Sequence, residues 1–153
     1  MRIRTRLAAV AMVGIMLCWA AYGETPALRA ERELFASVNQ ARRAQGLAPL
    51  RWDESLAAAA RRHANVMAEH GSAQHGFEGE PNLSARAKQA GARFSWLSEN
   101  VTQGPTPGFI HSQFMKSPPH RANIVDTDMD SIGVGVVEQG GQLFAVEDFS
   151  QAR

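Results

Sequence analysis

Two histidines and a glutamate stand beside turn-forming residues at three separated points of this 153-residue chain. His75 lies between two helical patterns, Glu99 precedes Asn100, and His120 follows a pair of prolines. Loops carry many binding and catalytic residues because a rigid scaffold holds them in place. Two imidazoles and one carboxylate are a donor set for zinc or another divalent metal, with a coordination position left open. The sequence therefore predicts that these three side chains converge on one cleft.

The same groups leave two classes of function open. A binding module would use the cleft to hold a ligand, whereas a metal-assisted hydrolase would use His75, Glu99 and His120 to hold a reactive water. A nucleophilic serine is poorly supported, because Ser117 is followed by proline rather than placed in a Gly-x-Ser-x-Gly turn. The spacings also lack a His-x-x-x-His helix pair, so a metal site would not be preorganised on one helix. Binding is the favoured interpretation, and hydrolysis of a peptide, ester or cell-wall substrate is the alternative.

Residues 1–23 have the pattern of a secretory signal peptide. Three arginines among the first six residues precede an uncharged apolar run over 7–21, and a small-x-small site stands before Glu24. The run is shorter than the roughly 20 residues that a spanning helix needs. We therefore expect cleavage here, a mature chain without a transmembrane segment, and a secreted or periplasmic location. The only cysteine, Cys18, lies inside this segment, so the mature chain should be free of disulfides.

The remainder is long enough to form one domain with its own core. The whole chain has a formal net charge of +1, and no basic cluster suggests nucleic acid as a partner. Composition leaves the oligomeric state open.

Helical periodicity comes first in the chain and strand-like runs come last. The pattern predicts helices from Glu31 to Gly46, from the Asp53 N-cap to Gly71, over 83–90, and from Pro107 to the proline pair at 118–119. Runs over 132–137 and 143–149 flank Gly140-Gly141 and predict a hairpin. Further strands are expected over 98–103 and near Arg51-Trp52. This order indicates an α+β domain.

Six pieces of the chain, taken in order, resemble the CAP superfamily (SCP-like domains; cysteine-rich secretory protein, antigen 5, pathogenesis-related 1) in its short bacterial form. The pieces are the connection 47–52, the Leu/Ala/His helix 56–67, His75 followed by Arg86, Glu99-Asn100, the segment Phe114 to Ile124 with its Ser-Pro-x-His-Arg core, and the closing runs 132–135 and 147–149. The resemblance implies one domain over residues 31–150. It also implies a three-layer α-β-α sandwich with a central, mainly antiparallel sheet.

The resemblance further implies a cavity lined by two histidines and two glutamates. His75, Glu99 and His120 match three of them, and the fourth would fall near Ser117, where this chain has no carboxylate. Glu147 or Asp148 is the candidate replacement, but strand alternation lets at most one of these two point inward. The family's implied role is an exported binding or interaction module that takes a divalent metal and a lipid or cell-envelope ligand. His63, on the apolar face of its helix, is interpreted instead as a hydrogen-bonded core histidine.

Overall fold

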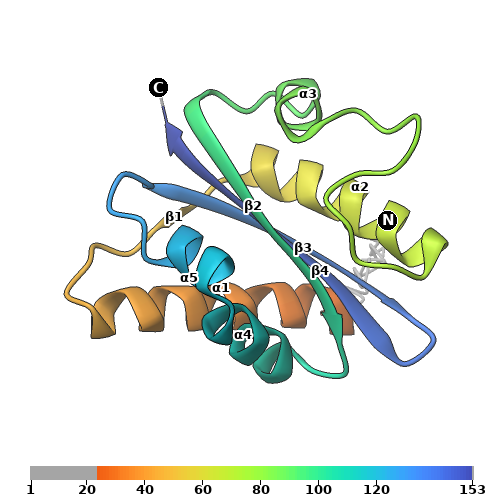
Figure 1. The fold of residues 1–153 in the computed structure, drawn as a ribbon, viewed down its shortest axis with the longest axis horizontal. Coiled ribbons are helices and arrows are strands. Elements are labelled where there is room, and N and C mark those ends of the chain that lie inside the picture. Colours follow the sequence, from red (N-terminus) through yellow and green to blue (C-terminus); the bar gives the residue numbers. More distant parts are fainter. Residues whose placement is uncertain (1–23, 153) are drawn as a thin grey trace, which may run out of the picture.

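Four strands form a sheet at the centre of the molecule, in a computed structural model that describes residues 24–152 (Figure 1). The strands are β1 (Arg51–Trp52), β2 (Phe94–Gly104), β3 (Ser131–Gln139) and β4 (Gln142–Ala152). Their order is β1-β3-β4-β2, with β1 parallel to β3 and the other pairs antiparallel. The predicted hairpin is confirmed as β3 and β4. Its turn uses Gly140 and Gly141, whose φ angles of 60° and 75° suit a tight hairpin connection.

Five helices cover the two faces of this sheet. They are α1 (Pro26–Ala44), α2 (Glu54–His70), α3 (Leu83–Gln89), α4 (Pro107–Lys116) and α5 (Pro118–Ile124). The Asp53 side chain caps α2 by accepting from Leu56 N–H, as the sequence predicts. Helix α1 begins at Pro26 rather than at Glu31, because Thr25 supplies a cap and Pro26 suits the first helical position.

Each sheet face has its own apolar core. Helices α1, α4 and α5 pack on one face around Leu34, Val38, Phe114, Ile132 and Phe149. Helix α2 covers the other face around Ala60, Ala64, Met67, Val101 and Val146. The expected α+β sandwich with the sheet in the middle is thereby confirmed.

Helix α2 approaches the sheet closely because β3 carries glycine where the two touch. A Cβ atom on Gly133 would overlap the backbone nitrogen of Ala57, and one on Gly135 would overlap that of Arg61. The backbone of α2 therefore packs directly against β3. This contact fixes how close α2, which carries His63, lies to the sheet.

Buried Arg42 ties α1 to the connection between α5 and β3. Its guanidinium donates to the carbonyl oxygens of Ile124 at 3.0 Å and of Asp126 at 2.7 Å, and its Nε donates to Ala48 O at 2.8 Å. Backbone carbonyls that would otherwise lie buried and unpaired are satisfied by one side chain.

The register between β2 and β4 sorts the acidic residues by face. Glu99 pairs with Asp148 and Asn100 pairs with Glu147, so Glu99 and Asp148 face α2, and Asn100 and Glu147 face α4 and α5.

Within residues 24–152, no helix has both the length and the apolar character needed to cross a bilayer. The predicted signal peptide over 1–23 lies outside the described residues.

Candidate functional site

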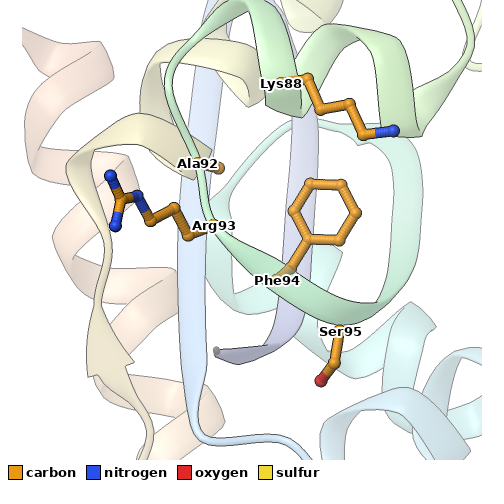
Figure 2. Close-up of a pocket in the computed structure, with 5 residues that line it drawn as sticks. All are labelled: Lys88, Ala92, Arg93, Phe94 and Ser95. Atoms are coloured by element: carbon orange, nitrogen blue, oxygen red, sulfur yellow. The ribbon is translucent and has the colours of Figure 1, made fainter.

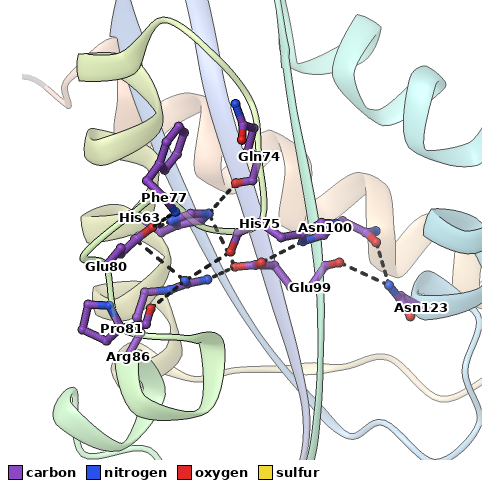
Figure 3. Close-up of polar contacts among 10 residues, drawn as sticks. All are labelled: His63, Gln74, His75, Phe77, Glu80, Pro81, Arg86, Glu99, Asn100 and Asn123. Carbon is purple, nitrogen blue, oxygen red and sulfur yellow. Dashed lines mark hydrogen bonds and ion pairs between the residues drawn. The ribbon is translucent and has the colours of Figure 1, made fainter.

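A buried carboxylate joins an exposed imidazole to a buried guanidinium at the edge of the sheet (Figure 3). His75 Nδ1 lies 2.9 Å from Glu99 Oε1, and Arg86 donates to Glu99 Oε2. The His75 side chain is 61% exposed, whereas the side chains of Glu99 and Arg86 are 3% and 4% exposed. The hydrogen bond that the Glu99 carboxylate accepts from His75 raises the pKa of His75. The structure therefore brings two of the three predicted site residues into direct contact.

Arg86 also fixes the loop that presents His75. From α3 its guanidinium donates to His75 O at 3.3 Å and to Pro81 O at 3.1 Å. The sequence pattern included Arg86 without a role for it. Its contacts join residues 5, 11 and 13 positions away, so periodicity alone gave no signal for them.

His63 is a fully buried, hydrogen-bonded core histidine, as predicted. Its Nδ1 lies 2.6 Å from Glu80 Oε1, and its Nε2 lies 2.8 Å from Gln74 O. Glu80 also accepts from Phe77 N–H at 3.2 Å. These bonds hold the loop on both sides of His75. The sequence reasoning missed Glu80, since a lone loop acid carries no signal of its partner.

His120 is attached on the other side of β2 (Figure 3 shows the Asn100 and Asn123 links). Asn100 Nδ2 donates to His120 O at 3.1 Å, and Asn123 Nδ2 donates to Asn100 Oδ1 at 2.9 Å. The His120 ring meets Phe114 edge-on at 5.2 Å between centroids. Burial and the charge of nearby His75 lower the pKa of His120. The charge of His75 therefore acts on His120. His120 itself is held through its backbone carbonyl and not by Glu99.

Glu147 and Asp148 point to opposite faces of the sheet, as strand alternation predicts. Glu147 lies on the side of His120, and its Oε2 accepts from Asn100 Nδ2 at 3.1 Å. Burial raises the pKa of Glu147 to about 8. Asp148 shares the face of Glu99, and burial together with the charge of Glu99 raises the pKa of Asp148 well above its usual range. Of the two candidates for a fourth cleft residue, Asp148 therefore neighbours Glu99, and Glu147 neighbours the His120 backbone.

The arrangement can move a proton but supplies no activated nucleophile. A histidine beside a carboxylate is a competent acid or base. Ser117 is the N-cap residue before α5, and in the described part of the chain its hydroxyl makes no hydrogen bond with either imidazole. The serine of a triad needs such a bond to lose its proton.

The residues present do not form a three-ligand metal centre as they stand. Both Glu99 oxygens are bonded, to His75 and to the positively charged Arg86. Across residues 24–152, no group of three or more His, Cys, Asp or Glu side chains is placed to hold an ion. Two imidazoles remain as donors, and the metal site stays a prediction.

Comparison with protein families matches residues 35–149 to the model described as the cysteine-rich secretory protein family, CAP. A Bacillus subtilis (strain 168) protein, named "Uncharacterized protein YkwD", is 32% identical over 111 residues, which is 72% of this chain. The matched region spans 43% of that relative's length, so the relative contains much that this chain does not match.

Two solved structures have the same fold. An outer surface protein from Borrelia burgdorferi superposes with a TM-score of 0.75 at 20% identity, covering 82% of this chain and 94% of that one. An extracellular protein containing an SCP domain from Bacillus anthracis str. Ames also gives a TM-score of 0.75, at 23% identity over 84% of this chain and 44% of the other. At these identities the likeness concerns the fold.

Proposed function

The chain belongs to the cysteine-rich secretory protein (CAP) family, and from this premise we propose that it is an exported binding module with its ligand surface at His75 and His120. An exported location is supported by the signal-peptide pattern over 1–23 and by fold relatives named as outer-surface and extracellular proteins. The site proposal depends on the residues themselves.

The observation that carries the proposal is that each oxygen of the buried Glu99 carboxylate already has a partner within the protein. A general base needs a lone pair directed at the substrate proton. Here one Glu99 oxygen is bonded to His75 and the other to Arg86, so the carboxylate serves to orient and charge His75. The imidazole is left exposed, with Nε2 as its remaining polar atom. An oriented, exposed imidazole next to a second histidine suits recognition of a ligand more than turnover of a substrate.

The proposed ligand is a lipid-like or other cell-envelope molecule with an anionic group. A raised pKa makes His75 more readily cationic than a free histidine, and a cation at the rim attracts phosphate or carboxylate. A divalent metal is the less well supported ligand, because Arg86 occupies the carboxylate oxygen that would complete the donor set.

Binding of the purified protein to phosphatidylglycerol vesicles, and separately to zinc chloride, tests this proposal. We expect vesicle binding that strengthens as pH falls through the pKa of His75 and that weakens about tenfold or more in the His75→Ala/His120→Ala double variant. His70→Ala is the matched control, because His70 is an exposed histidine stacked on Phe77 outside the Glu99 network.

A peptide, ester and cell-wall substrate panel run on the same samples gives the opposing outcome. Turnover that disappears in both single histidine variants and depends on added zinc would establish the hydrolase instead. Equal vesicle binding by the wild type and the double variant would show that His75 and His120 do not form the binding surface.

A further inference from the structure

Trp96 is the most exposed of the large hydrophobic side chains in the described chain, at 62% of its accessible surface. It stands at the start of β2, which is an edge strand of the sheet. An indole left in water loses the stabilisation that burial of its ring would provide, and exposed aromatic surface commonly marks a site of interaction.

A β-bulge determines where this indole points. Phe94 pairs with Ala152 and Trp96 pairs with Gln151, so two steps along β2 correspond to one step along β4. Residues two apart on a regular strand share a face, but the extra residue Ser95 sends Phe94 and Trp96 to opposite faces. Two aromatic rings therefore lie on either side of one short piece of backbone. Such bulges re-aim side chains at functional sites.

Trp96 forms one wall of two hollows. One, of about 410 Å³, is also lined by Ser95, Gln151, Asp126 and Asp128. The other, of about 370 Å³, lies toward Leu83, Ser84 and Phe94. The indole thus forms a ridge between two depressions, and both volumes lie within the range of small-molecule sites.

A third hollow lies beside the start of β2. It has a volume of about 610 Å³ and is lined by Lys88, Ala92, Arg93, Phe94 and Ser95. Figure 2 shows the Phe94 ring on the same side of the strand as Lys88, with Arg93 directed to the other side. All three hollows are lined in part by Ser95, so they adjoin one another around the start of β2.

The polar groups beside Trp96 can accept hydrogen bonds from a ligand. One Asp126 oxygen already accepts from Asp128 N–H at 2.9 Å, and Ser95 Oγ donates to Gln151 Oε1 at 3.0 Å. The second Asp126 oxygen, the exposed Asp128 carboxylate and the Gln151 amide N–H groups remain for an outside partner.

From this combination we infer a second binding surface, centred on Trp96, for a linear glycan chain. The face of an indole is electronegative and attracts the weakly positive C–H groups on the flat side of a pyranose ring. Sugar hydroxyls are donors that carboxylates accept strongly. Asp126 and Asp128 would repel an anionic lipid head group from the hollow that they line, which argues for a glycan over a membrane surface in that hollow. The inference does not depend on the His75 site.

Titration of the purified protein with chitohexaose and with cellohexaose tests the surface, by calorimetry and by the change in tryptophan fluorescence. We expect binding of at least one of the two oligosaccharides, weakened about tenfold or more by Trp96→Ala and much less by Trp96→Phe. Asp126→Asn/Asp128→Asn should also weaken binding, because amides are weaker acceptors for sugar hydroxyls.

Two variants separate this site from the rest of the molecule. Trp52→Phe changes the other tryptophan of the described chain, which packs edge-on against Phe35, and should bind as the wild type does. His75→Ala should likewise retain the glycan, so failure of one proposed site is distinguishable from failure of the other. The inference is overturned if neither oligosaccharide binds, if Trp96→Ala binds as tightly as the wild type, or if Trp96 supports binding to phosphatidylglycerol vesicles instead.

Discussion

Three buried carboxyl groups near the site, on Glu99, Glu147 and Asp148, differ in what stabilises them. Glu99 has a guanidinium and an imidazole as partners. Glu147 has a single amide donor from Asn100, and its Oε1 is unpaired. Asp148 is buried opposite Glu99, and neither of its oxygens has a hydrogen-bond donor in the described chain. Burial favours the neutral acid wherever no cation compensates, and it accordingly raises the pKa values of Glu147 and Asp148.

Replacing Glu147 by Gln should make the protein more stable in alkaline solution. The folded-state pKa of about 8 lies above the usual value of 4.5, so the stability that the protonated carboxyl provides is complete below about pH 4.5 and is lost as pH rises through 8. Glutamine removes that loss and keeps an acceptor for Asn100. We expect a gain of about 2 to 4 kcal/mol in unfolding free energy at pH 8 and little difference at pH 4.

Urea unfolding of wild type and Glu147→Gln at the two pH values measures this. Glu138→Gln, on the exposed end of β3, is the control and should leave the pH dependence unchanged. An equal difference between wild type and Glu147→Gln at both pH values would contradict the buried neutral carboxyl.

Replacing Arg86 by Met should destabilise the fold by about 3 to 5 kcal/mol, because a buried Glu99 loses its cation and the carbonyls of His75 and Pro81 lose a donor. Lys88→Met on the exposed side of the same helix should be nearly neutral. The double variant Arg86→Met/Glu99→Gln should recover part of the loss, measured by thermal unfolding. If the double variant is no more stable than Arg86→Met alone, Arg86 stabilises the fold only through its contacts with the backbone carbonyls.

The sequence grouped His75, Glu99 and His120 through their loop positions and through their resemblance to a family pattern. Their residue types alone say nothing about which ones touch. The Glu80 and Arg86 partnerships arise when a loop folds back over α2 and α3, and no local propensity encodes that path. By contrast, the opposite orientation of Glu147 and Asp148 follows from the two-residue period of a strand, so it was predictable.

At the scale of elements, the contact between α2 and β3 depends on the absence of two side chains. Gly133→Ala would place a methyl group against the α2 backbone, which cannot move without disturbing the whole helix. We expect a loss of about 3 kcal/mol in unfolding free energy, comparable to the larger overpacking costs. Gly108→Ala in α4 is the matched control, because no atom lies within 4 Å of its added Cβ. Gly108→Ala should be neutral or stabilising, and equal effects of the two substitutions would refute this account.

Helix boundaries were predictable where a cap and a turn residue coincide. Thr106 with Pro107 marks the start of α4, and Asp53 with Gly71 bounds α2. The same signature at Thr25 with Pro26 starts α1, five residues before Glu31, where the apolar spacing that predicts this helix begins. The short strand β1 lies where a strand was expected, near Arg51-Trp52, but its pairing with β3 some 80 positions later could not be predicted from any local pattern.

At the scale of the whole molecule, the described chain is stabilised by packing on both sheet faces without any cysteine. A reductant should therefore leave the thermal unfolding midpoint unchanged, and mass analysis of exported protein should find a chain that begins near Glu24 and lacks Cys18. A midpoint that falls with reductant would reveal a disulfide between two copies through Cys18, and would contradict cleavage of the first segment.

The position of β3 and β4 has a consequence for the order in which the molecule can fold. These two strands follow α1 and α2 in the chain, yet they occupy the centre of the sheet and contribute to both cores. Helices α1 and α2 therefore have no sheet to pack against until β3 and β4 have been synthesised, and most helical stability in proteins comes from such packing. A chain that emerges from its N-terminus thus lacks its central sheet until β3 and β4 are free. The pairings of these strands with β1 and β2 span long stretches of sequence and form late, which makes them the slow part of folding.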